Sequence, residues 1–193
     1  MIAAAPVRVI VTGEVGSGKT QTCAEATARL RDLGWGVAGV LSMGVWAGKK
    51  KIAIDALDVR SGDMRRLADH ASENHHTQGP ATPGWRFHAE TIAWCNLLLS
   101  AAADCDLLVV DELGPLEFES GEGLIQGMRA LDDGRFRLGL VVVRPRLIHA
   151  AQACWPTAAV LTLRGPAESP SAVDRLLAIA VGLKPLIREA DTM

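Results

Sequence analysis

The residues best suited to chemistry lie near the amino terminus, in the segment Gly13-Glu-Val-Gly-Ser-Gly-Lys-Thr20. It follows the pattern G-x-x-x-x-G-K-[ST], whose small residues allow several backbone N–H groups to surround phosphate oxygens. Lys19 adds a full positive charge for the β- and γ-phosphates, and the Thr20 hydroxyl is a hard oxygen ligand that suits Mg²⁺. The segment predicts a nucleotide-binding loop made of Gly13, Glu14, Val15, Gly16, Ser17, Gly18, Lys19 and Thr20.

A second group of reactive residues is the acidic pair Asp111-Glu112, which directly follows the predicted strand 106–110, apolar from Leu107 to Val110. An acid at the end of such a strand is placed to hold the Mg²⁺ of a bound nucleotide, so Thr20 and Asp111 are the predicted metal ligands. Neighbouring residues of a regular strand point to opposite faces, so Glu112 reaches the same nucleotide only if the strand has ended. Gly114-Pro115 favours such an end, and Glu112 is then the predicted general base for an attacking water.

Two arginines and a lysine cluster are further candidates. Arg144 follows the predicted strand 138–143, at the edge where α/β sheets bind ligands, and is expected to stabilise charge on the γ-phosphate. Arg164 follows the predicted strand 158–163, and its position favours contact with the base or ribose. Each arginine is also compatible with an ordinary exposed position at a strand end. Lys49-Lys50-Lys51 is predicted to form a solvated hairpin tip.

Together the two motifs resemble a known family. Thr12–Thr20 and Val110-Asp-Glu-Leu-Gly-Pro-Leu-Glu117 resemble the thermophile-type, or cancer-related, nucleoside-triphosphatases, whose pattern D-E-[IL]-G-x-[LM]-E is complete here. The resemblance implies a RecA-like P-loop fold. It also implies Mg²⁺-dependent hydrolysis of nucleoside triphosphates such as ATP and GTP to diphosphate and phosphate, with broad base tolerance. The chain departs from the family at Val15, where proline is common, and at residues 164–166, so the resemblance does not extend to base recognition.

The elements that must position these residues alternate in a characteristic order. Beyond residue 89, helices and strands alternate, which favours right-handed crossovers in one mainly parallel sheet flanked by helices. An antiparallel hairpin excursion precedes them, followed by a predicted long polar loop at 69–83. The sequence thus predicts an α/β fold, with residues 1–183 as a single domain and 184–193 as a loosely ordered tail. The predicted strands are 7–11, 36–43, 51–59, 106–110, 138–143 and 158–163, and the predicted helices are 21–33, 89–103, 121–131, 146–154 and 171–181.

The charge composition of the chain argues against two classes of binding partner, nucleic acids and membranes. The 193 residues carry 20 basic and 22 acidic side chains, a net charge of −2, so no basic field is present to hold nucleic acid or an anionic membrane. We therefore expect nucleoside triphosphates as ligands, without nucleic-acid or membrane binding, while the sequence identifies no protein partner. The spacing of the four cysteines fits neither a zinc site nor a disulfide framework, which favours a cytoplasmic protein with reduced thiols.

Two alternative functions stay open. A small kinase would pass the γ-phosphate to a metabolite or nucleotide, although such enzymes usually close an arginine-rich lid and only Arg86 follows the predicted loop, with Arg65 and Arg66 before it. A nucleotide-dependent switch would hydrolyse slowly and reset its hold on a partner. Labelling of an acceptor would identify the kinase, and dependence on a partner would identify the switch.

Overall fold

The computed structural model describes residues 5–72, 78–103 and 105–183. Five helices and nine strands lie within these ranges, together with short helical turns. The strands are β1 (Val7–Thr12), β2 (Val37–Ala47), β3 (Lys50–Asp58), β4 (Met64–His70), β5 (Ala81–Thr82), β6 (Trp85–Phe87), β7 (Leu107–Leu113), β8 (Leu138–Val143) and β9 (Ala159–Thr162). The helices are α1 (Lys19–Asp32), α2 (Ala89–Ser100), α3 (Ile125–Asp133), α4 (Ile148–Cys154) and α5 (Ser169–Leu183).

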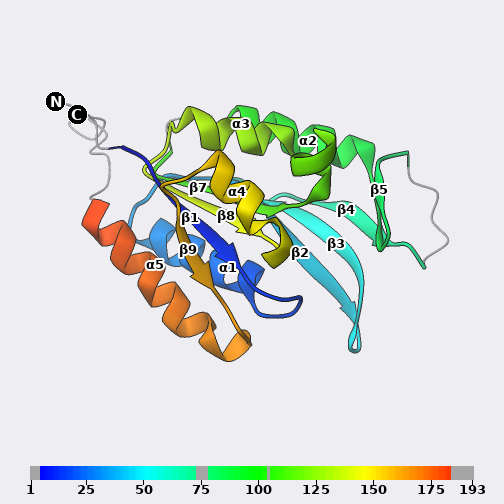
Figure 1. Cartoon of the computed structure of the whole chain (residues 1–193), viewed down its shortest axis with the longest axis horizontal. Coiled ribbons are helices and arrows are strands. Elements are labelled where there is room, and N and C mark those ends of the chain that lie inside the picture. The colour runs from blue at the N-terminus through cyan, green and yellow to red at the C-terminus, as the bar shows by residue number, and fades with distance from the viewer. Residues whose placement is uncertain (1–4, 73–77, 104, 184–193) are drawn as a thin grey trace.

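All nine described strands belong to one sheet in the order β5-β6-β4-β3-β2-β7-β8-β1-β9 (Figure 1). The five strands from β2 to β9 in that order pair in parallel. From β2 outward to β5 every pairing is antiparallel. The predicted mainly parallel sheet with an antiparallel excursion is therefore confirmed. Strand β8 separates β1, which leads into the glycine-rich loop, from β7, which carries the acidic pair.

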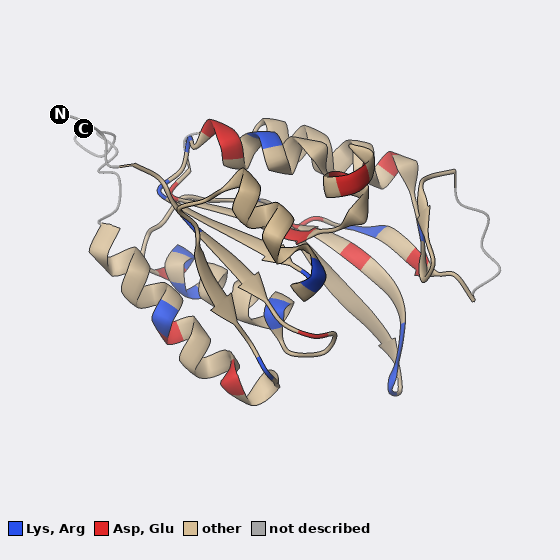
Figure 2. Ribbon diagram, viewed as in Figure 1, with Lys and Arg blue, Asp and Glu red and all other residues tan. Residues whose placement is uncertain are grey.

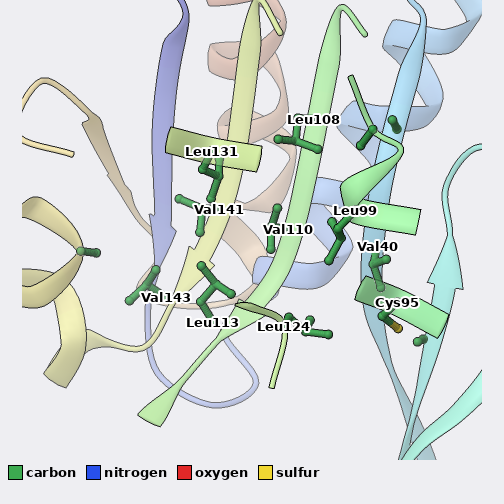
Figure 3. Packing of buried hydrophobic residues seen from close by; sticks show 14 of the residues in the cluster. Val40, Cys95, Leu99, Leu108, Val110, Leu113, Leu124, Leu131, Val141 and Val143 are labelled. Carbon is green, nitrogen blue, oxygen red and sulfur yellow. The ribbon is translucent and has the colours of Figure 1, made fainter. Parts of the chain in front are cut away.

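Helices cover both faces of the parallel strands. Figure 1 shows α2 and α3 on one side of the sheet and α1 and α5 on the other. Within β7, Leu108 and Val110 pack in the core beneath α2 and α3, which Figure 3 shows, whereas Leu107 and Val109 join the core beneath α1 and α5. Burial on both faces explains why residues 107–110 of this strand are all apolar instead of alternating between apolar and polar.

The predicted long loop at 69–83 is wrong at both of its ends. Strand β4 continues through His70, and β5 lies inside the predicted loop at its other end. Cross-strand partners stabilise this part of β4. His70 pairs with Trp85, and the centroids of their edge-to-face rings are 5.3 Å apart. The middle of that loop, 73–77, and the predicted tail, 184–193, lie outside the described residues.

The helix predicted at 121–131 starts later than expected. It begins at Ile125, and a separate short helical turn, η1 (Leu116–Ser120), precedes it. Gly121 and Gly123 both take a left-handed backbone conformation, with φ of 67° and 71°, which interrupts helical geometry between the two elements. No helix among the described residues has the length and apolar character needed to span a bilayer.

Candidate nucleotide and metal site

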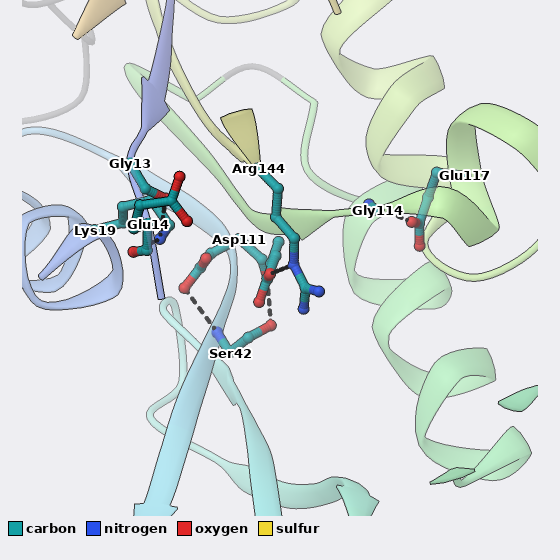
Figure 4. Close-up of polar contacts among 9 residues, drawn as sticks. Gly13, Glu14, Lys19, Ser42, Asp111, Gly114, Glu117 and Arg144 are labelled. Atoms are coloured by element: carbon teal, nitrogen blue, oxygen red, sulfur yellow. Dashed lines mark hydrogen bonds and ion pairs between the residues drawn. The ribbon is translucent and has the colours of Figure 1, made fainter. Parts of the chain in front are cut away.

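The glycine-rich segment forms a tight loop between β1 and α1. A Cβ at Gly13 would lie 2.2 Å from the Leu163 carbonyl oxygen, so only glycine lets the loop pack against the end of β9. Gly18 has φ of +92°, a conformation that side chains disfavour, where α1 begins. The Lys19 ammonium donates hydrogen bonds of 2.8 Å to the carbonyl oxygens of Gly13 and Glu14 (Figure 4). Lys19 thus lies against the loop that is predicted to bind the phosphates of a nucleotide.

The remaining residues of the loop differ in exposure. Glu14, Val15 and Gly16 are exposed at its tip, whereas Ser17 is buried. The buried Ser17 hydroxyl has no hydrogen-bonding partner among the described residues. The loop therefore contains a buried hydroxyl that is available to a ligand.

Asp111 is fully buried near the carboxyl end of β7, where the sequence predicted a metal ligand. Ser42 of β2 holds it: its N–H donates to Asp111 Oδ2 at 3.1 Å, and its hydroxyl donates to the Asp111 carbonyl (Figure 4). The other carboxylate oxygen, Oδ1, is buried without a hydrogen-bonding partner in the described part of the chain. Burial, and secondly the charge of Glu112, raise the pKa of Asp111 to about 7, although Thr20 and the Ser42 N–H favour its ionised form.

Glu112 reaches this edge by a route that the sequence did not predict. The strand does not end before Glu112, because β7 runs through Leu113. Instead, the pairing with β8 shifts: Asp111 pairs with Val142 and Leu113 with Val143, which leaves Glu112 as an extra residue. Such a bulge interrupts strict alternation and redirects a side chain. The predicted proximity of the two acids has a different structural cause from the expected one.

Arg144 lies beside Glu112. Its Nε donates to Glu112 Oε1 at 2.5 Å, and both side chains are partly exposed. Glu112 lies in β7 and Arg144 follows the neighbouring strand β8, so the bulge and the end of β8 bring together a carboxylate and a guanidinium. The sequence suggested a separate role for each, and the structure makes them a pair.

Arg164 lies at the same carboxyl edge but on the other side of β1. Its N–H donates to Glu168 Oε2 at 3.0 Å, and the residue is exposed. Its contact with a base or ribose stays a prediction.

Lys51 interacts electrostatically with the acidic pair, which the sequence did not reveal. Lys49 and Lys50 are exposed, as predicted for a hairpin tip, but Lys51 is partly buried. Figure 2 shows the basic end of this hairpin. Burial lowers the pKa of Lys51, and the negative charges of Glu112 and Asp111 act in the opposite direction. The prediction of a fully solvated tip is therefore wrong for this lysine.

A second bulge explains why Lys51 faces the acids. Val45 pairs with Ala53 but Trp46 pairs with Lys51, so Ile52 is the extra residue in β3. Directly paired residues share a face, and Trp46 shares its face with Gly44 and Ser42. Consistently, a Cβ at Gly44 would lie only 2.9 Å from Lys51 Cε. Without the bulge Lys51 would point to the opposite face, and single-sequence patterns carry no clear signal of it.

Glu117, the last acid of the D-E-L-G-P-L-E segment, has a structural role. It is buried, and its two carboxylate oxygens accept hydrogen bonds of 2.7 Å from the N–H groups of Gly114 and Leu124. Burial raises its pKa, and these hydrogen bonds oppose that effect. Glu117 thus ties η1 to the segments that flank it, next to Glu112.

Comparison with known proteins places these features in a family. The sequence model of a family described as NTPase matches residues 8–150, which include the glycine-rich loop, the acidic pair and Arg144. The chain belongs to this NTPase family. The match confirms the family that the two motifs suggested.

Curated members of the NTPase family are similar over most of this chain. Nucleoside-triphosphatase THEP1 of Caldivirga maquilingensis is 29% identical over 134 residues, which cover 69% of this chain and 74% of the relative. The protein of the same name from Thermococcus kodakarensis is 33% identical over 121 residues, 60% of this chain and 64% of that one.

Two solved structures share the NTPase-family fold. The solution structure of a human cancer-related nucleoside triphosphatase superposes with a TM-score of 0.68 at 19% identity, covering 94% of this chain and all of that one. The crystal structure of THEP1 from Aquifex aeolicus gives a TM-score of 0.66 at 14% identity, covering 90% and 99%. These likenesses confirm the P-loop NTPase fold.

Proposed function

We propose that this member of the NTPase family hydrolyses nucleoside 5′-triphosphates to diphosphate and phosphate, with Mg²⁺ and with broad tolerance of the base. The observation that carries the proposal is the gathering of a lysine-bearing phosphate loop and an Asp111–Glu112–Arg144 cluster at one edge of the sheet. The name nucleoside-triphosphatase borne by similar proteins supports the same activity.

The residues present suit Mg²⁺. Asp111 Oδ1 is buried without a hydrogen-bonding partner among the described residues, although Ser42 engages the second oxygen of the same carboxylate. A hard carboxylate oxygen of this kind, with the Thr20 hydroxyl nearby, is the donor set that Mg²⁺ prefers. Thr20 and Asp111 would hold the ion, which would neutralise charge on the triphosphate.

The loop residues bind and orient the nucleotide. Lys19 is held by two backbone carbonyls of its own loop, and the β- and γ-phosphates compete with these neutral acceptors for its charge. The loop amides and the start of α1 add partial positive charge at the same place.

On the opposite side of the γ-phosphate, Glu112 accepts the proton that an attacking water loses. Arg144 orients the Glu112 carboxylate through their 2.5 Å contact and presents positive charge to the developing transition state. Lys51 is the second cation on this side, since its alkyl chain crosses Gly44 on the face that carries Ser42.

Base tolerance is the part of the proposal that concerns Arg164. The segment after β9 is exposed at this residue, and an exposed guanidinium can contact a ribose or different bases without a closed, base-specific pocket. Similar turnover of purine and pyrimidine triphosphates would support this view.

Phosphate release from ATP, GTP, CTP and UTP tests the proposal directly. We expect release from all four with Mg²⁺ and none in excess EDTA. Full activity in EDTA would remove the metal from the mechanism. Absence of release from any nucleotide by the folded protein, with nucleotide binding intact, would instead favour the binding-switch alternative.

A further inference from the structure

A cavity of about 550 Å³ adjoins the Glu112–Arg144 pair on the side of the antiparallel strands. Its walls are largely apolar and come from β3, β4, β6, α2 and η1, with Trp85 and Phe87 as the aromatic members. Charged and polar side chains also line it: Glu112, Glu117, Glu119, Arg144 and Arg146, together with Ser42, Thr82 and Ser120. None of the loop residues 13–20, all of which the structure describes, lines it.

The order of the strands shows that this cavity is not the cradle of the nucleotide. The phosphate loop follows β1, with β9 on one side and β8 and β7 on the other. The loop packs against the end of β9 through Gly13 and Leu163. A triphosphate whose γ-phosphate faces Glu112 therefore extends away from the cavity. The cavity lies beyond the γ-phosphate, where an attacking group must approach.

Its size and lining exceed what hydrolysis requires. A single water needs only about 10–15 Å³ of such a volume, whereas pockets of roughly 300–1,000 Å³ typically hold a small organic molecule. Nearby groups also fix its wall, because Glu117 ties η1 to Gly114 and Leu124. Glu117 is engaged by these two hydrogen bonds, which leaves Glu112 and Arg144 as the charged pair where the cavity adjoins the nucleotide site. A largely apolar cavity beside such a pair is suited to a molecule with an apolar body and a reactive polar group.

We propose that this cavity binds a second substrate, a small organic alcohol with an apolar or aromatic body, which accepts the γ-phosphoryl group. This inference rests on the proposed function, because it uses the same nucleotide loop and the same Glu112. The aromatic rings of Trp85 and Phe87 would pack against the body of the alcohol, and its hydroxyl would take the place of the attacking water beside Glu112.

The transfer step balances without any further reactant. The hydroxyl oxygen of the alcohol forms a bond to the γ-phosphorus as the bond from that phosphorus to the β,γ-bridging oxygen breaks. The hydroxyl proton passes to Glu112. The products are a phosphate monoester and the nucleoside diphosphate, which leaves with the bridging oxygen and its electron pair.

The test compares the amounts of ADP and free phosphate formed from γ-labelled ATP. Hydrolysis gives equal amounts, whereas transfer to an alcohol gives more ADP than phosphate and a labelled monoester. The probes are a cell extract filtered to contain only small molecules and, as a defined compound, benzyl alcohol. We expect an excess of ADP of at least twofold with the active probe.

Variants at two glycines locate the effect. An added Cβ at Gly84, which lines the cavity, or at Gly182 of α5 meets nothing within 4 Å, and neither residue has a positive φ. Gly84→Phe should return the ratio of ADP to phosphate to one, at whatever rate of hydrolysis the variant retains. Gly182→Phe, the matched control, should keep the wild-type excess. If Gly84→Phe does not fold, Ala81→Phe, on an exposed residue that also lines the cavity, replaces it.

The outcomes separate this inference from the proposed function. Equal ADP and phosphate from the wild-type protein with every probe would overturn the acceptor site and leave hydrolysis intact. An excess that the cavity variants keep would also overturn it, because the acceptor would then bind elsewhere. Absence of any ADP formation would contradict the proposed function itself.

Discussion

Glu112 is the residue at which proton transfer can be separated from binding. Glutamine keeps the shape of this side chain and its contact with Arg144 but cannot accept the proton of an attacking water. We expect Glu112→Gln to bind Mg²⁺-nucleotide nearly as well as the wild type, while hydrolysis falls by about two to four powers of ten. Single-turnover phosphate release and equilibrium nucleotide binding measure the two quantities. A variant with nearly full activity would contradict the general-base role.

Lys51 tests whether the hairpin contributes a cation to the reaction. Lys51→Gln should reduce the turnover rate by roughly 10-fold to 100-fold, because a positive charge near the acidic pair, where transition-state charge develops in the proposed mechanism, is lost. Binding of ADP should change little, whereas binding of ADP with aluminium fluoride, which imitates the transferring phosphoryl group, should weaken in parallel with turnover.

Lys49→Gln, at an exposed lysine of the same hairpin, is the control and should retain wild-type turnover. If both variants lose activity equally, the effect belongs to the charge of the hairpin as a whole. If Lys51→Gln weakens ADP binding and analogue binding alike, the lysine acts on nucleotide binding and not on the transition state.

These residues also show how far sequence reasoning reaches. The loop 13–20 and the pair Asp111-Glu112 are local patterns, so their chemistry can be inferred without a fold. Ser42 and Asp111 are 69 positions apart and Glu112 and Arg144 are 32 apart, so these contacts depend on which strands are neighbours. Lys51 depends on a single extra residue in β3. A register shift of one residue moves a side chain to the opposite face of the sheet, and no periodicity in the sequence predicts such a shift.

The position of the short helical turn η1 depends on one buried acid, Glu117. Glu117→Gln replaces a carboxylate that accepts two backbone hydrogen bonds by an amide with one accepting oxygen and one donating nitrogen. The N–H of Gly114 or Leu124 then faces a donor, which should lower the free energy of unfolding by about 1–3 kcal/mol. Urea denaturation measures this loss. Glu119→Gln, at an exposed residue of the same turn, should leave stability unchanged, and an equal loss there would contradict the explanation.

The parallel strands and the helices could be predicted because their apolar patterns are strong. The outer antiparallel strands β4, β5 and β6 were harder to predict. Strand β5 has two residues and β6 has three, too few for a pattern to emerge. Polar residues such as Asp69 and His70 lie in β4, and their composition resembles that of a loop. Strand pairing supplies hydrogen-bonding partners to this backbone, although the local sequence does not favour a strand. Asp69 pairs with Arg86, and its Oδ2 lies 2.9 Å from His88 Nε2.

At the scale of the whole molecule, the buried Asp111 makes stability depend on pH in the metal-free protein. Its pKa is about 7 in the folded chain, against an ordinary value of 3.8. Between these values the folded protein binds a proton that the unfolded chain has released, so the free energy of unfolding falls as pH rises. Each unit of pKa difference corresponds to about 1.4 kcal/mol, so a loss on the order of a few kcal/mol is expected.

Urea denaturation in EDTA at about pH 5 and about pH 8 measures this dependence. Asp111→Asn should weaken this dependence and leave the part that the raised pKa of Glu117 contributes in the same direction. The variant should therefore gain stability relative to the wild type as pH rises. Asp63→Asn, at an exposed carboxylate, should follow the wild type. A wild-type protein that becomes more stable across this interval would contradict the assignment.

The two edges of the sheet have a consequence for the behaviour of the protein at high concentration. Free edge strands present unpaired backbone groups to which other chains can add, the route to β-type aggregation. Here the two edge strands of the described sheet are β5, with two residues, and β9, with four. The longest strands are therefore all internal. A neighbouring molecule therefore finds little backbone on which to extend the sheet. The same short strands that are hard to recognise in the sequence limit intermolecular pairing of an otherwise extensive sheet.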